Sequence, residues 1–181
     1  MTPDLWPRAA SFAATAHEGQ FRRDGRTPYA AHPSRVAMTV AAVFGCIDDE
    51  ALAIAWLHDV IEDTTTDYED LLDGFNRTIA DGVAALSKNA ALPSERREAV
   101  YDEGLENADW RAKLVKLADV FDNMADATWD EQPPSAGKRE RLIARAVRAI
   151  GIARRDRSGN ASLARAAEVV EQALERFRAV G

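Results

Sequence analysis

The sequence predicts an all-α protein, folded as a bundle of helices. Ala, Leu, Arg and Glu are abundant, apolar residues recur three and four positions apart, and runs with period two are scarce. These patterns are typical of amphipathic helices rather than strands. With 181 residues, of which 46% are hydrophobic, the chain is long enough to bury one sizeable core. We therefore expect residues 1–181 to form a single domain.

The boundaries of the helices follow from local signals. Gly45 follows one helical segment, and the acidic residues after it suit the N-terminus of the next helix. Thr66 and Glu69 have the spacing of a capping box, and Pro133 and Pro134 break the chain before a new helix. The expected helices span residues 4–18, 33–44, 48–62, 67–73, 76–88, 94–107, 109–127, 136–155 and 160–179.

The main segment without helical character is "GQFRRDGRTPYAAHP". Glycines and prolines punctuate it, so we expect a loop or short turn. Arg22 and Arg23 lie in this loop, and His32 ends it by opening the next helix. An irregular, arginine-rich loop that ends in a histidine is an unusual feature for stability alone.

Composition excludes several classes of partner. The net charge of −7 argues against binding a nucleic-acid polymer through a broad basic surface, but it permits a small anionic substrate. No apolar run is long enough for a membrane helix, and the N-terminus lacks the pattern of a signal peptide. Cys46 is the only cysteine, which fits a reducing compartment. We expect a cytoplasmic protein, and no feature of the sequence specifies its oligomeric state.

Four polar residues gather in the stretch "AWLHDVIEDTTTD". On a continuous helix, His58, Asp59, Glu62 and Asp63 would fall within an arc of about 140°, opposite an apolar face. Taken alone, this stretch has an ordinary interpretation, because acidic residues near a helix end are usually solvated and a single histidine is often structural. The rest of the chain must decide between the two interpretations.

Two further segments supply groups of the same chemistry. His32 begins the segment "HPSRVAMTV", and Asp119 shares a helix face with Asn123 in "KLVKLADVFDNM". Imidazole combined with carboxylates suits a divalent transition ion such as Mn²⁺, Fe²⁺ or Zn²⁺. Two histidines and two aspartates from three helices could hold one ion and leave positions open for water and substrate.

The order of these residues, H…HD…D, resembles the pattern of the HD-domain metal-dependent phosphohydrolases. Five blocks, "AHEGQFRR", "PYAAHPSRVA", "AWLHDVIEDT", "LSK" and "VKLADVFDN", appear in the order found in the hydrolase domain of the RelA/SpoT family. The chain is thus similar to a free-standing small alarmone hydrolase. The resemblance is strongest over residues 10–127 and weaker over the C-terminal helices at 136–181.

The resemblance implies a role for each matching residue. The Mn²⁺ ligands would be His32, His58, Asp59 and Asp119. The carboxylates that handle water and its proton would be Glu62 and Asp63, and the residues that contact substrate would be Arg22, Arg23, Lys88 and Asn123. His17 lies in the "AHEGQ" block, where we interpret it as a structural histidine that orders the loop.

The activity implied by the resemblance is Mn²⁺-dependent removal of the 3′-diphosphate of (p)ppGpp, yielding GDP or GTP and pyrophosphate. One alternative is hydrolysis of another small phosphorylated metabolite, such as NADPH or a nucleotide. A second alternative is an inactive nucleotide-binding module. Val120 and Asp122 stand where the family has Arg and His. If Asp122 lines the pocket, its charge should repel a highly charged nucleotide.

Overall fold

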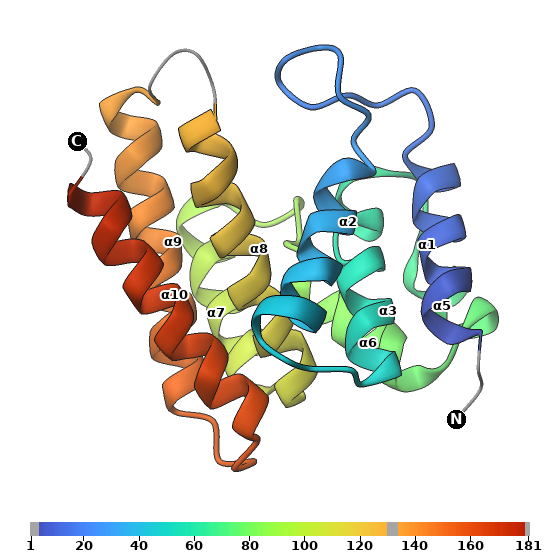
Figure 1. Cartoon of the computed structure of the whole chain (residues 1–181). Coiled ribbons are helices and arrows are strands. Elements are labelled where there is room, and N and C mark those ends of the chain that lie inside the picture. The colour runs from blue at the N-terminus through green and yellow to red at the C-terminus, as the bar shows by residue number, and fades with distance from the viewer. Residues whose placement is uncertain (1–3, 130–133, 180–181) are drawn as a thin grey trace.

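The computed structural model describes residues 4–129 and 134–179, and within these ranges it confirms the all-α fold (Figure 1). The only β pairing there is an isolated bridge between Phe21 and Pro28. None of these helices has the length and apolar character needed to cross a membrane. The elements are α1 (Leu5–Ala16), α2 (Ala31–Met38), the π-helical turn η1 (Thr39–Val43), α3 (Asp49–Leu57), α4 (Val60–Asp63), α5 (Tyr68–Gly74), α6 (Arg77–Leu86), α7 (Ser94–Asn107), α8 (Trp110–Trp129), α9 (Ala136–Arg154) and α10 (Ala161–Ala179).

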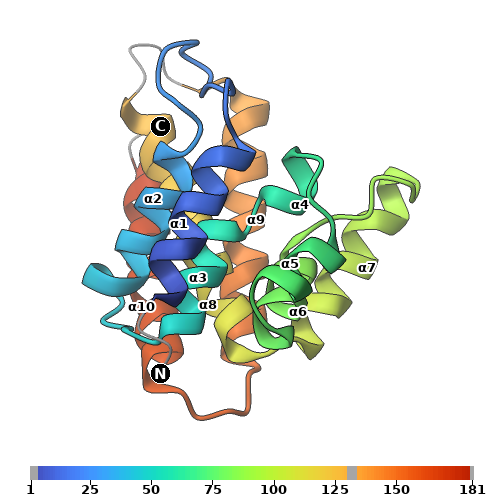
Figure 2. The same cartoon turned by 90° about the vertical axis from the view of Figure 1, so that its right-hand side faces the viewer.

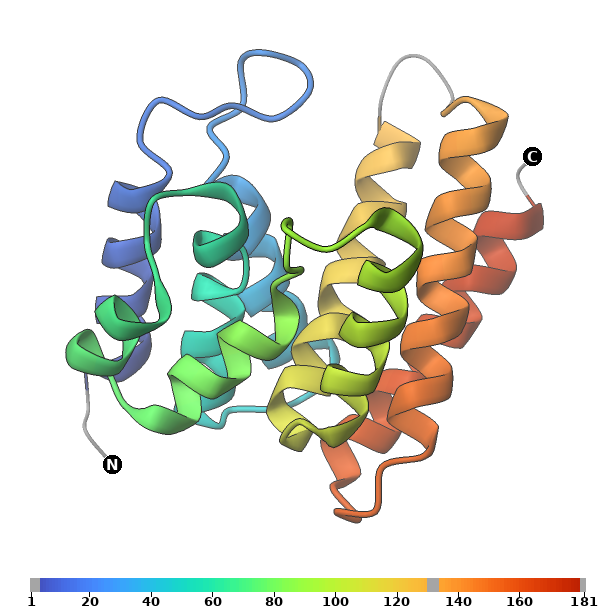
Figure 3. The same ribbon diagram turned by 180° about the vertical axis from the view of Figure 1, so that it is seen from behind.

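Helix α8 runs through the middle of the molecule and joins its two halves. It packs against α9 and α10 on one side and against α2 and α3 on the other (Figure 1). Helix α1 covers the far side of α3. Seen from behind, α6 and α7 lie across α3 and α8 (Figure 3). A polar side chain on the inner face of α8 is therefore surrounded by helices from both halves of the chain.

The buried apolar side chains form one continuous cluster that draws on both halves. Ile54, Leu57, Leu114 and Leu117 are fully buried where α3 meets α8. Helix α6 approaches α3 closely because Gly82 has no side chain, and a Cβ added there would lie 2.5 Å from Ile54 Cδ1. The close packing of α3, α6 and α8 therefore holds the polar side chains between these helices in fixed positions.

Two of the expected boundaries are wrong by small amounts, each for a local reason. The capping box lies one residue later than predicted: the Asp67 carboxylate accepts the Asp70 N–H at 3.0 Å, and Asp70 accepts the Asp67 N–H at 3.0 Å. Thr66 instead bonds to the Thr64 hydroxyl. The helix expected at 33–44 ends in η1, whose wider turn buries both Val40 and Phe44. Pro133 lies outside the described residues, so its expected break stays a prediction.

The loop between α1 and α2 is irregular, as expected. Gly19 and Gly25 adopt positive φ angles of 76° and 67°, a region that side-chain-bearing residues rarely occupy. The loop extends beyond the helix ends, on the same side as the last turn of α8 and the first turn of α9 (Figure 1). Its arginines therefore lie over one end of the helical bundle.

Candidate metal centre

Three of the four ligands predicted from the sequence, His32, His58 and Asp59, have donor atoms that all lie within 4.8 Å of one another, and Asp119 adjoins them through His32. His32 Nε2 lies 3.2 Å from His58 Nε2, 3.4 Å from Asp59 Oδ2 and 3.4 Å from Asp119 Oδ1. His58 Nε2 lies 3.1 Å from Asp59 Oδ2. Donor atoms about 2.1 Å from one ion, at angles of about 90–110°, are separated by about 3.0–3.5 Å. We call His32, His58, Asp59 and Asp119 the ligand cluster.

Three elements deliver the ligand cluster, and one of them departs from the expected helix. His32 lies in the first turn of α2, and Asp119 lies in the middle of α8. The helix expected at 48–62 is interrupted at His58 and Asp59, and α4 is a separate short turn (Figure 2). Neighbouring residues on a continuous helix point about 100° apart. The turn at Asp59, with φ −104° and ψ −4°, lets both side chains face one centre.

Hydrogen bonds fix how the two imidazoles face the centre. His58 Nδ1 donates to the Ala55 carbonyl at 2.8 Å, and His32 Nδ1 donates to Asp122 Oδ2 at 2.7 Å. A carbonyl and a carboxylate can only accept, so in the neutral imidazoles both Nε2 atoms present lone pairs. Two nitrogen lone pairs and two carboxylate oxygens then face each other, an arrangement that attracts a cation. The donor set fits a divalent transition ion.

The electrostatics of the cluster point the same way. Burial alone would lower the pKa of His32, but hydrogen bonds to Asp119, Asp122 and Asp59 outweigh it and raise the pKa well above its usual value. Burial would also raise the pKa of Asp119, but the adjacent Lys116 ammonium and His32 hold it far below its usual range. The cluster therefore stabilises positive charge, whether carried by a proton or by a metal ion.

Asp119 is fixed by its neighbours on α8. Lys116 Nζ bonds to Asp119 Oδ2 at 2.8 Å, and the Asn123 amide donates to Asp119 Oδ1. Oδ1 is also the oxygen that faces His32. Asn123, expected to meet substrate, is thus held one helical turn from the ligand cluster, and it also lines the hollow described below.

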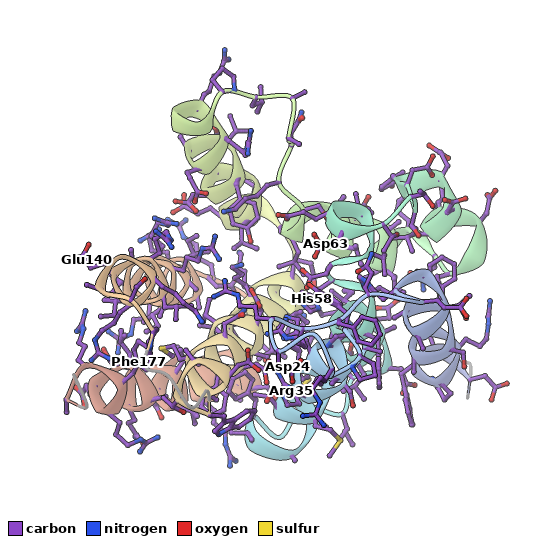
Figure 4. The ribbon with its side chains drawn as sticks, turned by 90° about the horizontal axis from the view of Figure 1, so that it is seen from above. Asp24, Arg35, His58, Asp63, Glu140 and Phe177 are labelled. Carbon is purple, nitrogen blue, oxygen red and sulfur yellow. The ribbon has the colours of Figure 1, made fainter. Side chains whose placement is uncertain are left out.

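The expected catalytic carboxylates lie on α4, at the exposed rim of the cluster. Figure 4 shows Asp63 near His58. Asp63 Oδ2 lies 2.8 Å from the Tyr29 hydroxyl, and that hydroxyl lies 2.7 Å from Asp59 Oδ2. One hydroxyl has one proton, so Tyr29 donates to one of the two carboxylates at a time. Glu62 Oε2 accepts the backbone N–H of Lys88 at 3.2 Å.

The sequence reasoning missed Tyr29 and Gln20, which connect the loop to these carboxylates. The Gln20 amide donates to the Asp63 carbonyl at 2.8 Å and accepts from His17 Nδ1 at 2.9 Å. The His17 ring stacks on Tyr29 with 4.5 Å between ring centroids. His17 thus orders the loop, as expected. Gln20 lies inside the block "AHEGQFRR" and Tyr29 inside "PYAAHPSRVA". Their position in these two family-like blocks could have marked them as site residues.

The two departures from the family pattern are both buried, so the condition that Asp122 lines the pocket is not met. Val120 belongs to the core. Asp122 is 3% exposed, bonds to His32 Nδ1 and receives two hydrogen bonds from Arg35. It therefore lies behind the ligand cluster, with its charge compensated by Arg35, and does not line the pocket.

A hollow of about 250 Å³ opens between α8, α9 and the loop that joins α1 to α2 (residues 17–30), which we call the arginine loop. Arg22 and Arg23 both line it, so the structure brings these two predicted residues together. Helix α9 contributes basic residues to the lining that were not predicted from the sequence. Residues 138, 141 and 145 nevertheless have the spacing of one helix face. The lining consists of Phe21, Arg22, Arg23, Tyr29, Asn123, Asp126, Lys138, Arg141, Leu142 and Arg145.

Lys88 lies apart from the loop arginines. Its ammonium pairs with Glu98 at 2.5 Å, and it lines a separate, water-sized space beside Lys116 and Tyr101. Arg145 lines both spaces. The structure therefore does not place Lys88 in the same hollow as Arg22 and Arg23.

Comparison with known proteins supplies the family. The sequence model of the HD domain family matches residues 9–150. The guanosine-3′,5′-bis(diphosphate) 3′-pyrophosphohydrolase MESH1 of Xenopus tropicalis is 36% identical over 68% of this chain and 73% of its own length. The MESH1 protein of Drosophila melanogaster is 38% identical over 64% of this chain and 65% of its own. A bacterial enzyme of the same activity, from Haemophilus influenzae, is 40% identical over 62% of this chain but only 17% of its own length.

A solved structure agrees with these sequence relatives. A metazoan ortholog of SpoT, described as hydrolysing ppGpp, superposes with a TM-score of 0.77 at 25% identity and covers 95% of this chain and 96% of its own. A Listeria monocytogenes protein, lmo0812, shares the fold alone, with a TM-score of 0.57 at 21% identity over 82% of this chain and 96% of its own. The resemblance found in the sequence is confirmed: the chain belongs to the HD domain family, in the branch that includes the MESH1 and SpoT proteins.

Proposed function

We propose that this protein is a metal-dependent pyrophosphohydrolase that removes the 3′-diphosphate of (p)ppGpp. The observation that carries the proposal is the convergence of the His32 and His58 imidazoles with the Asp59 carboxylate, with Asp119 adjoining His32, beside a hollow lined with arginine and lysine. The activity on (p)ppGpp for which the MESH1 and SpoT relatives are named supports the same substrate. We infer that the ion is Mn²⁺, as the resemblance to the alarmone hydrolases implies, and the nitrogen and oxygen donors of the cluster are compatible with Mn²⁺ as with other divalent transition ions.

The ligand cluster would hold the ion, and the chain's other residues would carry the remaining tasks. A divalent ion bound there polarises a phosphoryl oxygen and makes water more acidic. Glu62 and Asp63, which are both exposed on α4, would accept the proton of the attacking water. Tyr29 donates to Asp63 or to Asp59, which keeps both carboxylates oriented.

The hollow would bind the nucleotide through its phosphates. Arginine donates paired hydrogen bonds that match phosphate oxygens, and Arg22 and Arg23 both line the hollow. Lys138, Arg141 and Arg145 give α9 a basic edge on the opposite side of the same hollow. A substrate with phosphates at two positions could therefore contact both walls. Asn123 would meet the sugar between them.

The reaction would break one bond in one step. Water adds to the inner phosphorus of the 3′-diphosphate, the bond from that phosphorus to the 3′ oxygen breaks, and pyrophosphate is released. The 3′ oxygen leaves with a proton as a hydroxyl group. The nucleoside product is GDP from ppGpp and GTP from pppGpp.

Incubation of the protein with Mn²⁺ and ppGpp, followed by ³¹P NMR of the products, tests the proposal. We expect pyrophosphate and GDP. Orthophosphate as the sole phosphate product would overturn the assignment of the bond. NADPH is the comparison substrate: fast release of its 2′-phosphate without turnover of ppGpp would favour a phosphomonoesterase. Binding without turnover of either substrate would indicate a nucleotide-binding module.

A further inference from the structure

A continuous chain of hydrogen-bonded ion pairs connects the ligand cluster to the arginine loop. His32 Nδ1 bonds to Asp122 at 2.7 Å, and Asp122 receives the Arg35 Nε–H at 2.6 Å. The Arg35 guanidinium also donates to Asp126 Oδ1 at 2.9 Å, and Arg22 donates to Asp126 Oδ2 at 2.9 Å. The chain crosses from α2 to α8 and then to the loop.

The charges in this chain balance, which suits a fixed arrangement. Arg35 contacts both Asp122 and Asp126, and its guanidinium lies 5.3 Å from the ring centroid of Trp129. Figure 4 shows Arg35 on the same side of the bundle as the loop residue Asp24. Two guanidinium groups and two carboxylates thus form one neutral network. Neither carboxylate is left as a free negative charge beside the hollow.

Arg22 is held on two sides and yet keeps donors to offer. Asp126 engages one terminal nitrogen, and the guanidinium lies 5.6 Å from the centroid of the Tyr29 ring. The Arg22 side chain is 15% exposed, and its Nε is buried with no acceptor among the described residues. The terminal nitrogen that Asp126 does not engage belongs to a side chain that lines the hollow, so it can donate to a ligand there.

Arg23 provides the contrast within the same loop. It lines the same hollow but is exposed, and it makes no ion pair in the part of the chain that the structure describes. Freezing a long side chain at the moment of binding costs conformational entropy. A guanidinium already fixed by Asp126 avoids most of that cost, whereas Arg23 would have to be ordered by the substrate.

We propose that Asp126, supported by Arg35, is a positioning residue that fixes Arg22 as the arginine contacting a substrate phosphate. This inference rests on the proposed function and deepens it, because it assigns the phosphate contact to one of two adjacent arginines. It also gives a role to the pairing of Asp122 with Arg35: the same network orients the ligand His32 and the loop arginine. Substrate contact and metal ligand are thereby held in a fixed relation.

The test is a double-mutant cycle with a matched control. Asp126→Ala should lower kcat/KM for ppGpp about tenfold, mainly through KM, because Arg22 contacts the phosphate in ground and transition states alike. In an Arg22→Ala background the same substitution should change kcat/KM less than twofold. In an Arg23→Ala background the tenfold effect should persist. Asp126→Glu, which retains the charge, should recover part of the loss.

Readouts other than turnover complete the experiment. The dissociation constant of ppGpp, measured by calorimetry in the presence of a chelator, should follow the same cycle, and Mn²⁺ content should stay at the wild-type level in every variant. Additive effects of Asp126→Ala and Arg22→Ala would overturn the inference, and so would a lower KM in Asp126→Ala. Wild-type protein that neither binds nor hydrolyses ppGpp would instead overturn the proposed function.

Discussion

Helix α8 carries two buried polar sites that differ in how their charges are matched. Toward its N-terminus, Lys113 pairs with Asp156, which follows the end of α9, at 2.6 Å. The two side chains are 6% and 9% exposed. Further along, Asp119 belongs to the ligand cluster with His32 and His58. Both sites bury charge between helices, so burial alone does not separate a structural site from a functional one.

The balance of donors and acceptors does separate them. At the Lys113 site one ammonium meets one carboxylate, and the second oxygen of Asp156 accepts the Ser158 backbone N–H at 2.8 Å. In the ligand cluster two Nε2 lone pairs converge with the Asp59 carboxylate, and the Asp119 carboxylate adjoins His32, with no proton donor pointing to the centre from the neutral imidazoles. The first site is complete by itself, whereas the second is completed by a cation. Variants at the two sites should therefore fail in different ways.

The largest effect is expected in the ligand cluster. His58→Ala or Asp59→Ala should remove bound metal and abolish activity, because each removes one of the four predicted ligands. Elemental analysis of the purified variants measures the metal. His17→Ala is the control for metal content alone, since His17 is equally buried but acts on the site only indirectly, through Gln20 and Tyr29. Full metal occupancy in the His58 and Asp59 variants would overturn the assignment of the ligands.

The balanced pair should show the opposite behaviour. Asp156→Asn leaves the Lys113 ammonium buried without its partner, so it should lower the free energy of unfolding by about 3 kcal/mol. The kcat for ppGpp should not change. Urea denaturation measures the loss, and Glu171→Gln is the control because its exposed pair with Arg154 should contribute about 0.5 kcal/mol. A loss of activity without a loss of stability in Asp156→Asn would erase the distinction between the two sites.

The pH dependence of the same variant follows from the pKa of Asp156. Burial would raise that pKa, but hydrogen bonds from Lys113 and Ser158 outweigh it and hold it below the usual value. A carboxyl group with a lowered pKa in the folded state stabilises the fold above its unfolded pKa of about 3.9 and loses that contribution as the pH falls through the folded value. The difference in stability between wild type and Asp156→Asn should therefore be constant near neutral pH and shrink below about pH 4.

The sequence predicted most of the fold because helical periodicity is a short-range pattern, whereas the ligand cluster was predicted through the resemblance of separate motifs to those of a known family. Helical periodicity located most of the helices, and the resemblance named His32, Asp119 and the "HD" pair as candidate ligands, which stays a prediction. The break at His58 and Asp59 was missed because a continuous apolar face masks a turn that tertiary contacts impose. The capping box moved by one residue because Asp67 and Asp70 offer the same pattern one position later.

Contacts between distant segments explain what the sequence left out. The place of Asp122 was left open by the sequence, because its partner is Arg35 on another helix, which no local pattern reveals. The basic edge of α9 was missed because its relation to the arginine loop exists only in the folded protein. Lys88 was expected near the other substrate residues, but its pairing with Glu98 holds it in a separate space.

At the rim of the ligand cluster, a smaller effect is expected that leaves the metal in place. Glu62→Gln should keep the metal and the fold but lower kcat by about 10², the usual scale for a positioned acid or base. Asp63→Asn should behave similarly, and Glu69→Gln, on an exposed face of α5, is the control. Wild-type rates in both the Glu62 and the Asp63 variants would move proton transfer to another group.

The smallest effect is expected behind the ligand cluster, at Asp122. Asp122→Asn removes the charge that orients His32 and pairs with Arg35, so it should weaken Mn²⁺ binding about tenfold, the lower end of the range for partners of metal ligands. Activity measured against Mn²⁺ concentration would show the shift, and saturating Mn²⁺ should restore most of kcat. Asp126→Asn is the matched control, because Asp126 contacts Arg35 but not His32, and its Mn²⁺ affinity should stay at the wild-type level. If Asp122→Asn instead lowered KM for ppGpp and left the Mn²⁺ affinity unchanged, the Asp122 carboxylate would act on the substrate by repulsion. Asp122 would then belong with the groups that face the hollow and not with those that orient a metal ligand.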